Sequence, residues 1–261
     1  MTYTLIGFGN MGLALFDGLG KEHQGRVVEP KSERRKLAEE RGAKASPAPS
    51  AEFLEGSDVV ILVIKPQDAA QLASYRSFLG GYPIVSILAG TPTSRITEVT
   101  GSAQVVRLMP SLAASVGAAV VGVSPGQEAA PETLDRALRV AEALGRPFEL
   151  PERLMPAITG LSGSGIAFVF SFVHALALGG TKAGIPYDTA VDIAFELLKG
   201  AYETHRASGE PPMATVTKVC SPAGTTIDGI QALAEYNFDA AVIAAVTAAA
   251  DRAEELEHPG D

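Results

Sequence analysis

Three glycines near the start of the chain constrain its fold more than any other feature of the sequence. The segment Gly7-Phe8-Gly9-Asn10-Met11-Gly12 follows the apolar residues 3–6 directly and leads into a helical pattern over residues 13–19. A strand that enters a helix through such a turn aims free backbone N–H groups and the positive end of the helix at a pyrophosphate. The sequence therefore predicts a dinucleotide-binding loop, with a tight strand–helix turn that binds nothing as the alternative.

An acidic residue, Glu29, ends the next apolar stretch, twenty residues after Gly9. A carboxylate at this place typically accepts hydrogen bonds from the ribose hydroxyls and repels a 2′-phosphate, which favours NADH. Lys31, Arg34 and Arg35 follow at once, and their charges would neutralise that phosphate and favour NADPH. The same charges are also typical of an ordinary solvated helix face. NAD and NADP, in the reduced form, both stay open as the cofactor.

Composition and charge exclude several classes of protein. The chain has 261 residues, 46% of them hydrophobic, which is enough for one large domain or two of ordinary size. Its net charge of −9 argues against a nucleic-acid partner, which requires a clustered basic face. Cys220 is the only cysteine, so no internal disulfide forms and the chain fits a reducing cytoplasm. The four histidines lack the spacing of metal ligands, and we expect no metal site.

No segment of the sequence favours a membrane or an export signal. The first residues lack a basic segment and are used by the first predicted strand. The longest apolar stretch, residues 165–180, is interrupted by Ser171 and His174 and is short for a bilayer span. We expect it to form a buried helix of a cytoplasmic protein with no membrane partner. Because residues 164–183 are hydrophobic nearly all round, they imply deep burial or a subunit contact, and we expect a homodimer or a larger homo-oligomer.

The pattern of the chain changes near Pro151. Before it, apolar strand candidates (residues 4–8, 27–29, 59–64, 84–88, 105–109, 118–123 and 148–150) alternate with helical patterns (10–19, 32–41, 67–78, 93–100 and 131–144). After it, only helical patterns occur (154–160, 164–183, 187–206, 213–219, 226–233 and 240–257). Such alternation is typical of βαβ units and a parallel sheet. We predict an α/β protein, with a Rossmann-type doubly wound dinucleotide-binding domain over residues 1–151 and an all-helical substrate-binding and dimerisation domain over residues 152–261.

The helical half contains two polar segments of small residues. One covers residues 159–165 (Thr-Gly-Leu-Ser-Gly-Ser-Gly) and the other residues 220–226 (Cys-Ser-Pro-Ala-Gly-Thr-Thr). Each ends where a helix is predicted to begin, so each can aim free N–H groups and hydroxyls at an anion such as a carboxylate. Ordinary helix capping by serine and threonine is the alternative for each loop.

These segments resemble the pyrroline-5-carboxylate reductase family. Residues 219–233 are similar to its C-terminal signature, and residues 161–168 are similar to its Ser-Gly-Ser-Gly-Pro-Ala-Tyr stretch. Residues 63–67, 86–90 and 107–110 match further segments of the family in order. The resemblance thus covers nearly the whole chain, and the C-terminal signature is its most specific part.

The resemblance implies an enzyme that reduces the cyclic imine L-1-pyrroline-5-carboxylate to L-proline with NAD(P)H, the last step of proline biosynthesis. It implies that the second loop and its flank hold the substrate carboxylate, through Val219, Ser221, Ala223, Gly224, Thr225 and Thr226. It also places a set of strand-end residues beside the nicotinamide: Ile64, Lys65, Pro66, Ala89, Gly90, Met109 and Pro110. The remaining parts of the cofactor would be bound by the glycine loop and by the segment that ends the next strand. Their residues are Gly7, Phe8, Gly9, Asn10, Met11, Glu29 and Lys31.

Such a reduction requires little side-chain chemistry, because the cofactor supplies the hydride and the protein positions the reactants. A general acid need only keep or deliver one proton on the imine nitrogen. Thr159, Ser162 and Ser164 are the hydroxyl candidates for this catalytic role, and local helix capping is their alternative explanation. Cys220 has no evident base beside it for covalent catalysis.

Several residues depart from the family pattern. Ser111-Leu112 stand where Asn-Thr is usual, Ile166 and Phe168 replace Pro and Tyr, His174 replaces a common Glu, and Ala223 replaces a Gly. These departures leave alternatives open beside the leading function. The alternatives are a reductase of a related imine, a hydroxy- or amino-acid dehydrogenase, and a regulator that binds a dinucleotide without catalysis.

Overall fold

The computed structural model describes residues 1–257, and the chain forms two compact units. The first unit contains Met1–Ser164 and residues 248–257, and the second contains Gly165–Thr247. The sheet unit therefore includes more of the chain than residues 1–151. The functional division at Pro151 stays a prediction.

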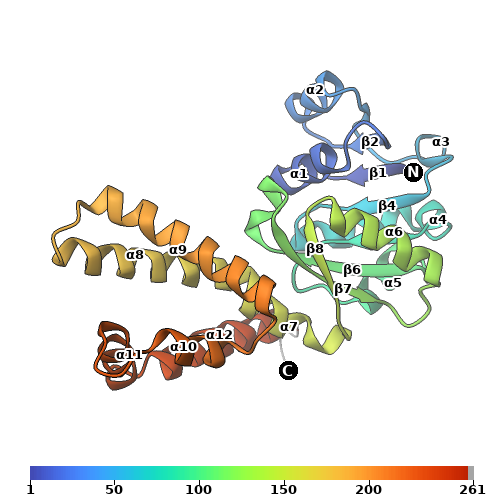
Figure 1. Cartoon of the computed structure of the whole chain (residues 1–261). Coiled ribbons are helices and arrows are strands. Elements are labelled where there is room, and N and C mark those ends of the chain that lie inside the picture. Colours follow the sequence, from blue (N-terminus) through green and yellow to red (C-terminus); the bar gives the residue numbers. More distant parts are fainter. Residues whose placement is uncertain (258–261) are drawn as a thin grey trace. The chain divides into compact units, whose positions relative to one another are not determined.

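The first unit is built on one eight-stranded sheet with the order β3-β2-β1-β4-β5-β6-β7-β8 (Figure 1). Its strands are β1 (Thr2–Ile6), β2 (Gln24–Val28), β3 (Lys44–Ser46), β4 (Val59–Leu62), β5 (Ile84–Ser86), β6 (Val105–Pro110), β7 (Ala119–Pro125) and β8 (Gly145–Glu149). Neighbours from β3 to β6 pair in parallel, β7 is antiparallel to β6, and β8 is parallel to β7. The order of the first six strands is that of a Rossmann fold, so the predicted fold class is confirmed.

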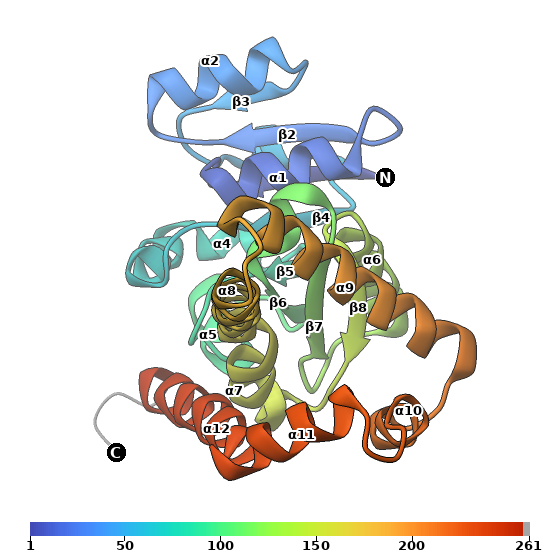
Figure 2. The ribbon, with the colours of Figure 1, turned by 60° about the vertical axis from the view of Figure 1, so that its left-hand side comes forward.

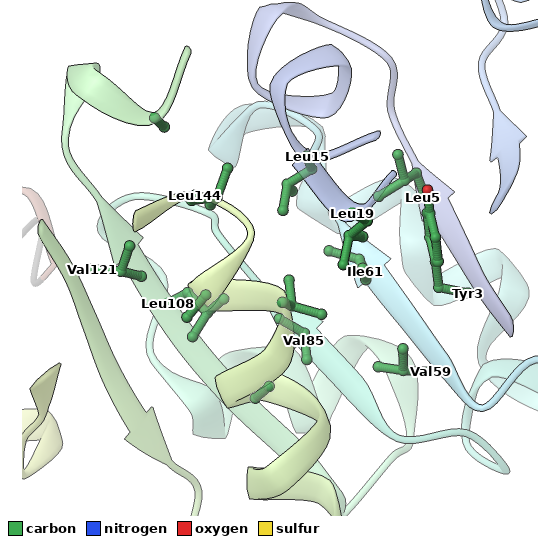
Figure 3. Close-up of a cluster of buried hydrophobic side chains, with 14 of the residues drawn as sticks. Tyr3, Leu5, Leu15, Leu19, Val59, Ile61, Val85, Leu108, Val121 and Leu144 are labelled. Carbon is green, nitrogen blue, oxygen red and sulfur yellow. The ribbon is translucent and has the colours of Figure 1, made fainter. Parts of the chain in front are cut away.

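Helices cover both faces of this sheet and bury two apolar cores. On one face, α1 (Asn10–Leu19), α2 (Ser32–Glu40), α6 (Pro131–Glu142) and the 3₁₀ turn η2 (Leu112–Val116) contribute to a core with Leu15, Ile61 and Leu108 (Figure 3). On the other face, α3 (Ala51–Leu54), the 3₁₀ helix η1 (Pro66–Tyr75), α4 (Arg76–Leu79) and α5 (Thr93–Thr100) enclose the second core. Strands β1 and β4 send residues to both cores, which explains why β4 is apolar at every position.

The second unit is entirely helical. A 3₁₀ turn, η3 (Glu152–Leu154), and α7 (Met155–Ile158) lead from the sheet through the π-helical turn η4 (Thr159–Ser164) to α8 (Gly165–Lys182). Then follow α9 (Tyr187–Ser208), α10 (Pro212–Val219), α11 (Thr225–Glu235) and α12 (Phe238–Glu257). Helices α8 and α9 lie side by side as a hairpin (Figures 1 and 2). The last part of α12 belongs to the sheet unit.

Two sequence expectations about this region are wrong. Residues 159–165 do not form a loop, because the turn η4 joins α7 and α8 into one helical run. Helix α8 is not buried in its own chain, since among its residues only Val173 and Ala177 are buried. The run over residues 152–182 is long and apolar enough, by length and composition alone, to cross a membrane, and 11% of its most apolar window is buried. Because α8 is exposed in the single chain, the other expectation for this helix, a contact between subunits, stays open.

Candidate active site

The predicted cofactor residues gather at one edge of the sheet. Because β2, β1, β4, β5 and β6 are parallel neighbours, their carboxyl ends share that edge. The edge is where open α/β sheets bind their ligands. At or just beyond these strand ends lie Gly7, Phe8, Gly9, Asn10, Met11, Glu29, Lys31, Ile64, Lys65, Pro66, Ala89, Gly90, Met109 and Pro110.

The three glycines of the first loop are required for different reasons. A side-chain carbon at Gly7 would lie 2.5 Å from the carbonyl oxygen of Val63, and one at Gly12 would lie 2.6 Å from that of Gly7. The fold itself therefore excludes side chains at Gly7 and Gly12. Gly9 has an ordinary φ of −77°, and a side-chain carbon there would meet only the terminal Nη1 of Arg34, at 3.3 Å. Since the fold tolerates a side chain at Gly9, its glycine indicates a ligand that approaches the backbone.

The start of α1 is free to bind such a ligand. Gly9 caps the helix without a side-chain hydrogen bond, and no acidic side chain lies in the first turn. The first N–H groups of a helix carry a partial positive charge and have no partner within the helix. The residues present thus fit a dinucleotide pyrophosphate at this point.

Glu29 and Arg34 fix the loop from both sides of Phe8. The Phe8 N–H donates to Oε2 of Glu29 at 2.9 Å, and Nη1 of Arg34 donates to the Phe8 carbonyl at 2.8 Å. The Lys31 N–H donates to Oε1 of Glu29 at 3.0 Å, and the Glu29 side chain is buried. Both carboxylate oxygens therefore already accept a main-chain hydrogen bond. Two N–H donors partly neutralise the charge with which Glu29 would repel a 2′-phosphate.

The three candidate proton donors differ in their hydrogen bonds. The Thr159 hydroxyl donates to the Met155 carbonyl at 2.7 Å, and the Ser162 hydroxyl donates to the Ile158 carbonyl at 2.8 Å. Such bonds to the preceding helical turn occupy the hydroxyl protons. Ser164 makes no side-chain hydrogen bond within residues 1–257, and of the three it keeps its proton available. The turn that carries them belongs to the sheet unit and lies near Met109, because a side-chain carbon at Gly163 would be 3.5 Å from the Met109 methyl group.

The second predicted loop connects α10 and α11 in the helical unit. Gly224 caps α11 without a side-chain hydrogen bond, so the N–H groups of the first turn are free. The loop folds tightly over this end, since a side-chain carbon at Gly224 would lie 2.3 Å from Oγ of Ser221. Thr226 is half-buried at the same helix end, and its hydroxyl has no partner among the described residues. This arrangement can bind a carboxylate without any cationic side chain.

Comparisons with known proteins show the family to which the chain belongs. A family model described as pyrroline-5-carboxylate reductase dimerisation matches residues 152–256, and one described as NADP oxidoreductase coenzyme F420-dependent matches residues 2–90. The chain is 38% identical to the pyrroline-5-carboxylate reductase of Methanosarcina acetivorans, over 96% of each chain. The chain belongs to the pyrroline-5-carboxylate reductase family. A pyrroline-5-carboxylate reductase structure from Coxiella burnetii matches with a TM-score of 0.90 at 26% identity, over 97% of each chain. The Plasmodium falciparum pyrroline carboxylate reductase, solved with NADP bound, shares the fold at 22% identity, a TM-score of 0.83 and 98% of each chain.

Two of the departures from the family pattern have local explanations. Ser111 is buried, and its hydroxyl oxygen accepts a hydrogen bond from the Val120 N–H at 3.2 Å, so this serine ties the end of β6 to β7. His174 is exposed on α8 and does not belong to the apolar core. Its Nδ1 lies 2.9 Å from the Tyr187 hydroxyl on α9, with the two rings edge to face. Within residues 1–257, His174 thus joins the helix hairpin rather than a catalytic cluster.

Ala223 is the departure with an energetic consequence. Its φ of 56° is left-handed, a region in which alanine is strained by about 1–2 kcal/mol and glycine is not. Ala223→Gly removes that strain but adds about 0.4–1 kcal/mol of backbone entropy to the unfolded chain. We expect a net stabilisation of about 0.5–1 kcal/mol in urea unfolding. The matched control Ala232→Gly, in the middle of α11, should lower the free energy of unfolding by about 1 kcal/mol. If both variants lower the free energy of unfolding equally, Ala223 is not strained.

Sequence reasoning missed one cluster at the site. Arg107 on β6 is buried and pairs with Glu257, the last described residue of α12, and with Glu152. The sequence contains a signal for Arg107 only in the family-like segment that ends in Met109-Pro110. Nothing in the pattern of the chain indicates the two carboxylates.

Proposed function

We propose that this chain is an NAD(P)H-dependent reductase that converts L-1-pyrroline-5-carboxylate to L-proline, the last step of proline biosynthesis. The observation that carries the proposal is the full-length relationship, 38% identity over 96% of both chains to a protein of that name, which spans both candidate sites. Two helix starts without a side-chain cap, one suited to a pyrophosphate and one to a small carboxylate, support it.

Each part of the chain has a simple task in this reaction. The bound nicotinamide cofactor supplies the hydride. The loop from Gly7 to Met11 and the start of α1 hold the pyrophosphate, while Lys65-Pro66, Ala89-Gly90 and Met109-Pro110 border the nicotinamide. The first turn of α11 and the Thr226 hydroxyl hold the substrate carboxylate, with the flanking loop residues from Val219. Ser164 is the proposed hydroxyl near the imine nitrogen, since Thr159 and Ser162 already donate to main-chain carbonyls.

Both cofactors are compatible with the adenosine end of this site. Glu29 favours ribose hydroxyls, but its carboxylate already binds two main-chain N–H groups. Lys31 and Arg34 lie beside it and can neutralise a 2′-phosphate. We propose that the chain accepts NADPH as well as NADH.

A substrate panel tests the proposed function. The absorbance decay of NADH and of NADPH is followed with L-pyrroline-5-carboxylate, with other cyclic imines and with 2-keto acids. We expect turnover with pyrroline-5-carboxylate and formation of proline. Turnover with keto acids alone would identify a hydroxy- or amino-acid dehydrogenase. Tight cofactor binding without turnover on any compound would identify a regulator and refute the proposal.

The helical unit is proposed to join a second copy of the chain. It exposes many large apolar side chains, among them Val169, Phe170, Leu178, Ile193, Phe195, Leu197, Tyr202 and Ile243. An apolar surface of this extent marks a protein interface, and the matching family model is one of dimerisation. At micromolar concentration, light scattering should give at least twice the 27.0 kDa of one chain. A monomeric mass would contradict this assembly.

The proposed setting is the cytoplasm, with a small imino acid as the partner. The net charge of −9 disfavours nucleic acid, and a single cysteine suits a reducing compartment. The apolar run over residues 152–182 is assigned to the subunit interface rather than to a membrane, because the dimerisation model covers it.

A further inference from the structure

A buried arginine lies beneath the proposed nicotinamide edge. Arg107 is 1% exposed and stands on β6, two residues before Met109. Its cross-strand neighbours are Ser86 on β5 and Ser124 on β7, both fully buried. These side chains share the face of the sheet that α5 covers, since Val105, two residues earlier, packs in that core. A charge in such a place requires an opposite charge beside it.

Two carboxylates from later in the chain, Glu152 and Glu257, supply that charge. Nη2 of Arg107 forms a hydrogen-bonded ion pair with Glu257, whose side chain is 8% exposed. Nη1 lies 3.8 Å from Oε1 of Glu152. Within residues 1–257, Nε and Nη1 of Arg107 and Oγ of Ser124 make no hydrogen bond. The positive charge of Arg107 is therefore balanced by these two carboxylates, and above all by Glu257.

The same carboxylates bind residues next to two of the three segments that are proposed to border the nicotinamide. The Glu152 carboxylate accepts hydrogen bonds from the N–H and from the hydroxyl of Thr93, each 2.7 Å long, and so fixes the start of α5. Three residues earlier, Gly90 adopts a φ of 62°, and a side-chain carbon there would lie 3.4 Å from the Leu256 carbonyl oxygen. The end of α12 is thus packed against the Ala89-Gly90 turn on one side and tied to β6 on the other.

We propose that Arg107 and Glu257 form a clasp that sets the position of the Ala89-Gly90 turn and the Met109-Pro110 segment for the cofactor. In this role Glu257 is a positioning residue and touches neither cofactor nor substrate. The importance of this clasp for catalysis rests on the proposed function, whereas its test measures cofactor binding alone. Removal of the Glu257 charge leaves Arg107 only the more distant Glu152 as a counter-charge, so the segments around Arg107 must rearrange.

The test compares Glu257→Gln with Glu254→Gln. Glu254 is exposed on the same helix, and its change removes the same charge without touching Arg107. NADPH affinity is measured by fluorescence titration below the melting temperature, where circular dichroism shows both variants folded. For Glu257→Gln we expect a dissociation constant about ten to a hundred times that of the unaltered chain, because small displacements of positioning groups have effects of this size. Glu254→Gln should stay within about twofold, as exposed charges contribute little.

Further measurements separate positioning from mere stability. Formate or acetate at millimolar concentration should restore part of the NADPH affinity of Glu257→Ala, because a small anion can replace the missing carboxylate beside Arg107. A Glu257→Gln variant that melts earlier but binds NADPH like the unaltered chain would overturn the clasp. If that variant does not fold, Glu152→Gln takes its place, with a smaller expected loss of affinity, and unchanged binding there would also overturn it. If the unaltered chain binds NADPH but does not reduce pyrroline-5-carboxylate, the proposed function is refuted and the proposal of the clasp is not.

Discussion

Gly9→Val is expected to abolish NAD(P)H binding while the chain folds normally. The valine side chain would occupy the space beside the backbone that the pyrophosphate needs, whereas within the protein it meets only the end of Arg34. A clash of about 3 kcal/mol lowers affinity by roughly a hundredfold or more. Fluorescence titration with NADPH and thermal unfolding measure the two quantities on the same sample.

Gly12→Ala is the matched comparison in the same loop. Its added methyl group would lie 2.6 Å from the Gly7 carbonyl oxygen, so the fold has to shift. We expect a loss of about 1–3 kcal/mol in the free energy of unfolding, as for other overpacked positions. Cofactor affinity that is unchanged in Gly9→Val would mean that the loop does not bind the dinucleotide.

Thr226→Ala is expected to raise the KM for pyrroline-5-carboxylate and to leave NADPH affinity unchanged. The Thr226 hydroxyl and the free N–H groups of α11 are the proposed donors to the substrate carboxylate. A hydrogen bond to a charged group contributes about 1.5–3 kcal/mol, which corresponds to roughly a ten- to hundredfold change in KM. Steady-state kinetics with the imine as the varied substrate give the value.

Thr217→Ala controls for the loss of a threonine in the same unit. Thr217 is exposed on α10, and its hydroxyl donates to the Met213 carbonyl of its own helix. Its kinetics should match those of the unaltered chain. If Thr226→Ala also behaves like the unaltered chain, the carboxylate site at the start of α11 is wrong.

Much of the fold could be predicted because its signals are local. The bounds of α1 (Asn10–Leu19) and α5 (Thr93–Thr100) agree with the predicted ranges, since their caps and apolar spacing lie within one segment. Strand β3 (Lys44–Ser46) was missed because it is short, lies at the sheet edge and has no apolar alternation. The turn η4 (Thr159–Ser164) was predicted as a loop, since glycine and serine are weak helix formers and only the flanking helices hold them in π-helical geometry.

The site could be predicted only where chain order places its residues. The glycine loop and the start of α11 follow from consecutive residues, and so does the proximity of strand ends in a parallel sheet. The pairing of Arg107 with Glu257 joins positions 150 residues apart, and no periodicity encodes it. The hydrogen bond from Phe8 to Glu29 likewise changes what that carboxylate can do, and it depends on the conformation of the loop.

Transfer of a labelled hydride from the cofactor to the imine tests the proposed reaction itself. The chain is incubated with L-pyrroline-5-carboxylate and NADPH that carries deuterium at C4 of the nicotinamide, on one face at a time. We expect L-proline with one deuterium at C5 from one of the two labelled cofactors, measured by mass spectrometry. Proline without deuterium from both, or no proline at all, would contradict it.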